Sequence, residues 1–152
     1  ILWCKYNNKF RNKQMEYQEF DLPRYDWGVY AFYDVTNRDV EAVMDCLDYI
    51  GCKGETRVKA LNNILDGELN TGLTFSKNRQ TCIVFGRTSD AQNFAHTFTH
   101  EIGHCAIHIA SEYGIDPYGE ELCYIIGDLG AIMLPFASVH LCEHCSCKNK
   151  KH

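Results

Sequence analysis

The hydrophobic pattern first predicts strands. The run WGVYAFYDV over residues 27–35 is dense in aromatic and β-branched residues, which favours a β-strand. Further along, the segments GLTFS and TCIVFG flank the polar tetrapeptide Lys77–Gln80. Two apolar segments joined by so short a polar loop are typical of a β-hairpin, which we expect within 73–86.

Between these predicted strands, the apolar residues follow helical spacing. Apolar positions recur at intervals of three and four from Val40 to Ile50, which predicts a helix. Asn37 is expected to cap this helix and Gly51 to end it. A second helix is expected over 55–66.

The second half of the chain predicts two more helices. Ser89 and Gln92 match a capping box for a helix over 90–112. Asp116 followed by a proline is expected to begin the next helix, which should end before Pro135. The expected buried side of the first of these helices comprises Phe94, Phe98, Ile102, Cys105, Ala106 and Ile109.

The order of the elements suggests an α+β domain, with helices on one side of a small, mostly antiparallel sheet. The 152 residues suit a single domain, which we place at 1–139. Within it, residues 1–24 give no firm pattern. Residues 140–152 are rich in cysteine and histidine and then basic, and are expected to form a tail.

Composition narrows the possible functions. A net charge of −5 disfavours sequence-independent binding to nucleic acid, and 45% apolar residues can bury a core. We expect no membrane-spanning run of roughly 18 apolar residues. The nine cysteines show no regular pairing and the start of the chain lacks a signal-peptide pattern, so a cytoplasmic protein with reduced thiols is expected. The chain begins without Met, and a removed leader would be invisible.

The strongest chemical signal is His100-Glu101-Ile102-Gly103-His104, inside the predicted helix over 90–112. Histidines four apart share one helix face, where both can bind one zinc ion. Glu101 lies beside them and is placed to take a proton from a zinc-bound water. Gly103 costs about 1 kcal/mol of helix stability relative to alanine, which is easier to understand if something packs closely there. The alternative is that these histidines are ordinary polar or hydrogen-bonded positions.

A third protein ligand is sought at the start of the next helix. Glu120 lies 16 positions beyond His104, enough to end one helix, turn and come back. Such a carboxylate would complete a His₂Glu site with one position open to water.

These motifs resemble a known group. FTHEIGH followed by GEELCY is similar to the zincin-like metallopeptidases of the gluzincin type. Their second motif, a glutamate with a small residue three places on, matches Glu120 with Cys123 and leaves Glu121 in reserve. The longer string HEIGHCAIHIASEYGIDPYGEELCYIIGDLG resembles small zincin-like proteins of Bacteroides-group bacteria and their phages or mobile elements. The resemblance implies a minimal zincin-like domain and no particular substrate.

The string HEIGHCAIH also resembles the ImmA/IrrE-type peptidases, which cleave repressors. The likeness weakens downstream, where Cys123-Tyr124 follows Glu120 and the Met133-Leu134-Pro135 run is shifted relative to that family's pattern.

Several further residues are left open. His96 and His108 extend the histidine ladder, and either hydrogen-bond the metal ligands or make ordinary polar contacts. Asp128 either orients a ligand histidine or lies on the helix surface. The candidates for a group near the oxyanion are Tyr113, Tyr118, Tyr124 and His140.

The tail carries a second candidate metal site. Cys142, His144, Cys145 and Cys147 have the side chains for a structural zinc, although the spacing matches no familiar zinc finger. Reduced cysteines at a mobile end are the alternative.

The sequence therefore predicts a zinc-dependent metallopeptidase that hydrolyses a peptide or protein substrate. One strand of the 73–86 hairpin is expected to present an edge to which an extended substrate adds as another strand. A catalytically inactive zincin-fold binding or regulatory module is the alternative. A DNA-linked regulator is a third hypothesis; since no basic helix-turn-helix is found, it would act through a partner protein. No direct nucleic-acid or membrane partner is expected.

Overall fold

A four-stranded mixed sheet forms the middle layer of the domain. The computed structural model describes residues 15–67 and 70–141. The strands are β1 (Glu16–Leu22), β2 (Trp27–Val35), β3 (Gly72–Lys77) and β4 (Gln80–Gly86), in the spatial order β1-β2-β4-β3. The β1–β2 and β3–β4 pairs are antiparallel, while β2 and β4 run parallel. The predicted α+β class and mostly antiparallel sheet are confirmed.

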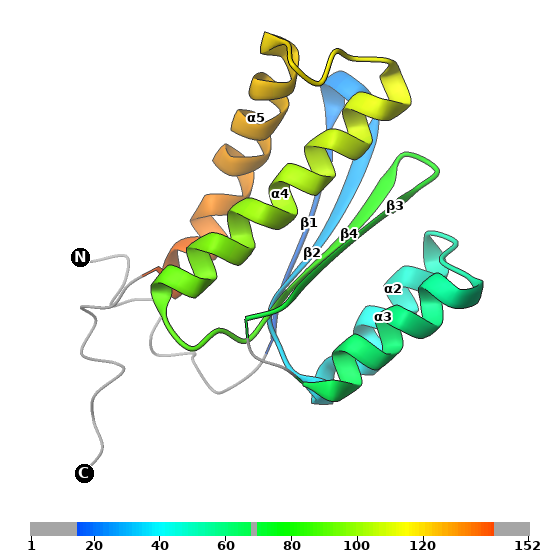
Figure 1. Ribbon diagram of the computed structural model, residues 1–152, viewed down its shortest axis with the longest axis vertical. Coiled ribbons are helices and arrows are strands. Elements are labelled where there is room, and N and C mark those ends of the chain that lie inside the picture. Colours follow the sequence, from blue (N-terminus) through cyan, green and yellow to red (C-terminus); the bar gives the residue numbers. More distant parts are fainter. Residues whose placement is uncertain (1–14, 68–69, 142–152) are drawn as a thin grey trace.

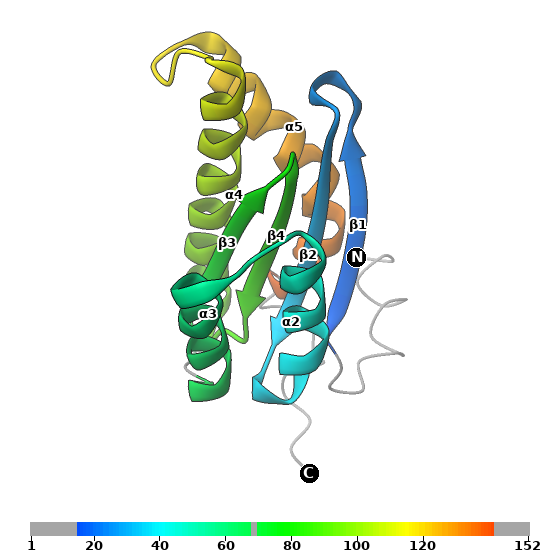
Figure 2. The same cartoon turned by 90° about the vertical axis from the view of Figure 1, so that its right-hand side faces the viewer.

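Helices cover both faces of this sheet, so the expectation of helices on one side is wrong. On one face lie α2 (Val40–Tyr49) and α3 (Gly54–Asp66), and on the other α4 (Ala91–Tyr113) and α5 (Glu120–Ala137) (Figures 1 and 2). The reason lies in β2, whose side chains pack into two separate cores: Val29 into the α4–α5 core and Phe32 into the α2–α3 core. A strand buried on both faces needs a layer on each side.

The first two helices follow the predicted pattern with one correction. Val43, Met44 and Leu47 are buried, as their spacing indicates. The side-chain cap is Thr36, not Asn37: Thr36 accepts the Arg38 N–H and caps a short 3₁₀ turn (Asn37–Asp39), which leads into α2 without a side-chain cap of its own. Thr36 has the extended backbone that a cap requires, whereas Asn37 already belongs to the turn.

The hairpin lies where the polar tetrapeptide predicts it. Asn78 and Arg79 both have positive φ angles, 53° and 56°, which suits a two-residue connection. The segment 16–22, left unassigned by its pattern, forms β1. Gln18 on β1 accepts the Tyr33 hydroxyl and donates to the Ile132 carbonyl, joining β1 to β2 and α5.

The cap of α4 is Asp90 and not Ser89. The Asp90 side chain accepts the Asn93 N–H at 2.8 Å, and Gly114 ends the helix in the left-handed conformation. All six residues predicted for its buried side are buried. It packs on β3 and β4, whereas α5 lies toward β1 and β2 (Figure 2).

The last helix starts later and ends later than predicted. Asp116 accepts the Tyr118 N–H at 2.9 Å and so forms a turn, and α5 begins only at Glu120. The helix continues through Pro135 because Met133 and Ala137, on either side of the proline, are both buried. This burial offsets the cost of a proline inside a helix.

One described segment, Glu120–His140, is long and apolar enough to cross a membrane by length and composition, contrary to the expectation of no such run. In the sequence, two acidic residues at its start, Glu120 and Glu121, and Asp128 inside it break up the apolar run. The buried residues Ile125, Leu129 and Met133 give the helix a second reason to be apolar, since they pack into the core that α5 shares with α4.

Candidate functional site

His100 and His104 converge on one point on the exposed side of α4. Their Nε2 atoms lie 3.0 Å apart and their ring centroids 4.7 Å apart. Two nitrogens each about 2.05 Å from one zinc ion, at this separation, subtend about 94° at the metal. The pair therefore suits two ligands of one metal ion.

Glu101 points away from this exposed side, toward β3. Its side chain is only 5% exposed. Thr74 on β3 donates its hydroxyl to Oε2 of Glu101 at 2.5 Å and also lies 3.3 Å from the Glu101 carbonyl oxygen. This partner satisfies a carboxylate that would otherwise be costly to bury.

A polar groove runs between α4, the start of β3 and the end of α3. Its volume is about 430 Å³, and both His100 and Glu101 line it. The other lining residues are Asn63, Asp66, Asn70, Thr71, Gly72, His96 and Thr97. The groove therefore places a candidate metal ligand and a candidate base beside the free edge of the sheet.

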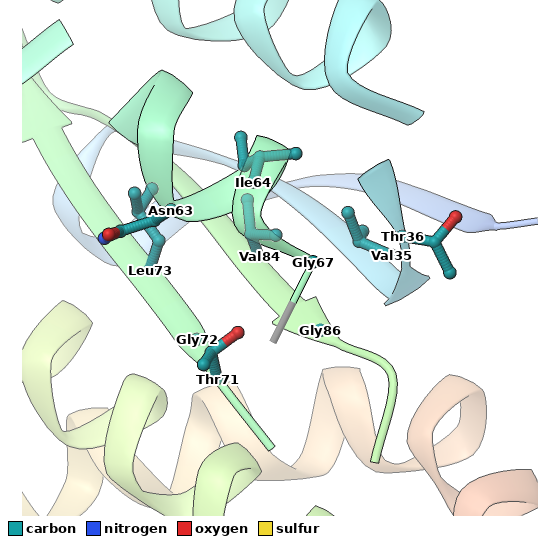
Figure 3. A pocket seen from close by; sticks show the side chains of 10 residues that line it. All are labelled: Val35, Thr36, Asn63, Ile64, Gly67, Thr71, Gly72, Leu73, Val84 and Gly86. Atoms are coloured by element: carbon teal, nitrogen blue, oxygen red, sulfur yellow. The ribbon is translucent and has the colours of Figure 1, made fainter. Parts of the chain in front are cut away.

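A smaller cavity of about 30 Å³ adjoins the groove and shares Asn63, Thr71 and Gly72 with it. Figure 3 shows Ile64 and Val84 beside it. It has room for a water molecule.

The two outer histidines of the ladder differ in their contacts. His96 lines the groove, with its ring centroid 6.1 Å from that of His100. His108 is half-buried, and its Nδ1 lies 2.7 Å from the Ser76 hydroxyl on β3. Burial, and then the nearby His104, lower the pKa of His108 below the usual histidine value.

The structure does not bring the predicted third ligand to the histidine pair. Nine residues of helix separate His104 from the end of α4, about 13 Å along the axis, and Glu120 lies beyond that end. Glu121 instead accepts the Tyr25 hydroxyl at 2.7 Å and lies 3.8 Å from Arg24. The pKa of Tyr25 is raised by burial and by this hydrogen bond.

Asp128 is exposed on the surface of α5, and its charge adds to the raised pKa of Tyr25. Within residues 15–67 and 70–141, no three or more His, Cys, Asp or Glu side chains form a group that could hold a metal. The described residues therefore supply two converging ligands and no complete site.

The oxyanion candidates do not line the groove. Tyr113 donates its hydroxyl to the Tyr25 carbonyl and lies under the Arg79 guanidinium. Tyr118 and Tyr124 are 97% and 56% exposed on the α4–α5 connection and on α5. His140 packs against Phe94, with ring centroids 4.8 Å apart.

The candidate tail site, Cys142, His144, Cys145 and Cys147, lies outside the described residues. The described cysteines, Cys46, Cys52, Cys82, Cys105 and Cys123, are all free thiols.

Sequence reasoning missed the partners of Glu101. Gly72 and Thr74 come from a strand 27 or more positions earlier in the chain. A signal was available: Thr74 and Ser76 alternate with the apolar Leu73 and Phe75, so one face of this strand is polar and must meet polar groups.

Comparison of the chain with protein-family models, curated proteins and solved structures finds no match.

Proposed function

We propose that the protein is a zinc-dependent peptidase that hydrolyses peptide bonds in the groove beside β3. His100 and His104 are the proposed metal ligands and Glu101 the general base. The observation that carries the proposal is the 3.0 Å separation of the two Nε2 atoms. The buried Glu101 carboxylate follows His100 directly in the sequence and lines the same groove as His100. Two imidazoles and an open polar groove suit zinc better than an oxygen-preferring cation.

The bound metal would supply a water of lowered pKa and polarise the scissile carbonyl. The protein supplies the proton acceptor. Thr74 holds Oε2 of Glu101, which leaves Oε1, beside Gly72, to take a proton and later return it to the leaving amine.

A catalytic zinc site of this kind takes a third protein ligand. The resemblance implies Glu120, with Glu121 in reserve, but the fold separates both from the histidine pair. Asp66 and His96 share the groove with His100 and are of types that ligate zinc. The proposal therefore depends on the two histidines and not on Glu120.

The free edge of β3 offers a place for an extended substrate. The hairpin strand 80–86 pairs on both sides, with β2 and β3, so the available edge belongs to β3. A peptide added to β3 would lie along the groove that Glu101 and His100 line.

A second candidate function is a binding module without catalysis. It is favoured by the lack of a three-residue metal group among the described residues. The observation that separates the two is whether zinc binding is accompanied by hydrolysis.

The test compares wild type with Glu101→Gln, using zinc content and cleavage of a fluorogenic peptide library. We expect the variant to keep its zinc and to lose about 10²-fold or more in cleavage rate. A wild type that binds zinc at the histidine pair and cleaves nothing would favour the binding module. Equal cleavage by both proteins would contradict the role of Glu101.

A further inference from the structure

A chain of hydrogen bonds runs through the protein interior and ends at His108. The indole Nε1 of Trp27 lies 2.8 Å from Oγ1 of Thr81, which lies 2.7 Å from Oγ of Ser76. The Ser76 oxygen lies 2.7 Å from Nδ1 of His108. The chain thus crosses from β2 through β4 and β3 to α4. Trp27 and Thr81 are buried.

The donors in this chain set its direction. An indole N–H only donates, so Thr81 Oγ1 accepts from Trp27. The buried Cys105 thiol also donates to Thr81 Oγ1, at 3.7 Å. With both lone pairs of this oxygen used, the Thr81 hydroxyl donates to Ser76.

Ser76 in turn donates its own hydroxyl to Nδ1 of His108. The reverse direction would leave the Thr81 hydroxyl with only the Cys105 sulfur, a weak acceptor. An imidazole that accepts at Nδ1 carries its proton on Nε2. Within residues 15–67 and 70–141, the structure shows no hydrogen-bond partner for Nε2 of His108.

We propose that this chain fixes His108 as the Nε2–H tautomer, and that His108 donates this N–H to a carbonyl oxygen of a peptide bound beside His104. The inference rests on the proposed peptidase function. Its geometric basis is the shared helix face: the ring centroids of His104 and His108 lie 6.3 Å apart. His108 thereby serves as a hydrogen-bond donor to the substrate. His100 and His104 cannot do so, because their Nε2 atoms are the proposed metal ligands.

The tautomer is tested by ¹⁵N NMR of the metal-free 152-residue chain, with the His108 signals assigned by their loss in His108→Gln. We expect Nδ1 to resonate as an unprotonated nitrogen and Nε2 as a protonated one. Ser76→Ala should shift His108 toward a mixture of tautomers, whereas Ser111→Ala, at an exposed position of α4, should not. A protonated Nδ1 in wild type would overturn the proposal.

The role of the His108 Nε2–H as a hydrogen-bond donor to the substrate is tested with the zinc-loaded protein and the fluorogenic peptide library. We expect His108→Gln and Ser76→Ala to lower kcat/KM by roughly tenfold or more at unchanged zinc content, with Ser111→Ala equal to wild type. Unchanged kcat/KM in both variants would show a purely structural chain and overturn the binding role. If wild type cleaves no peptide, the proposed function fails while the NMR result still decides the tautomer.

Discussion

The Glu101 carboxylate occupies the space that a side chain at Gly72 would fill. A Cβ built on Gly72 would lie 2.5 Å from Oε1 of Glu101 and 2.7 Å from its Cγ. The glycine at the start of β3 thus lets the candidate base lie flat against the strand, within reach of Thr74. The position of Glu101 is therefore set by the packing of α4 on β3.

Gly72→Ala should displace the Glu101 side chain. Overpacking of this kind costs about 1–3 kcal/mol, and we expect the free energy of unfolding in urea to fall by that amount. Peptide cleavage should fall as well, because Oε1 moves. Gly103→Ala is the matched control: nothing lies within 4 Å of its added Cβ, so helix propensity alone should raise the free energy of unfolding by about 1 kcal/mol.

The sequence pattern predicted the elements that depend on local spacing. The histidine pair and the buried side of α4 follow from helical periodicity. The expectation of close packing at Gly103 is wrong, because nothing lies within 4 Å of a Cβ added there.

The pattern did not predict how separate elements meet. The parallel pairing of β2 with β4 inserts the hairpin so that β3 becomes the edge above α4, and no local period encodes that choice. The same limit explains Glu120: its distance from His104 along the chain permits a return, but the return brings Leu129 and Met133 to the core and leaves Glu120 at the far end.

Glu120→Gln should leave zinc affinity unchanged, because the structure places Glu120 about 13 Å or more from His104 along α4. Competition with a chromophoric chelator measures the affinity. Glu121→Ala is the companion variant, expected to lose the Tyr25 hydrogen bond and about 1 kcal/mol of stability with no change in zinc affinity. A tenfold or larger loss of zinc affinity in Glu120→Gln would restore Glu120 as a ligand.

Stability should fall as pH drops below about 6.5, the ordinary pKa of histidine. The pKa of His108 is lowered in the folded protein, so the unfolded chain binds more protons in this range. His108 thus contributes stability that is present above pH 6.5 and lost on acidification. Urea unfolding between pH 5 and 8 should show a weaker pH dependence in His108→Gln than in wild type, and an equal dependence in both would contradict the assignment.

Cys105 should resist alkylation in the native protein. Burial raises the pKa of its thiol to about 12, so almost no thiolate is present at pH 8. Cys123, exposed on α5, is the internal control and should react with iodoacetamide. Peptide mapping by mass spectrometry should find Cys105 modified only after unfolding. Equal rates at the two positions in the native state would contradict the packing of α4 on β4.

Joint binding of zinc by His100 and His104 is the step on which the proposed peptidase depends. Elemental analysis of purified wild type and the double variant His100→Asn/His104→Asn tests it, and the difference between them cancels any zinc held by the C-terminal residues. We expect about one zinc ion fewer per chain in the variant, with the fold retained as judged by circular dichroism. Equal zinc content in the two proteins would contradict it.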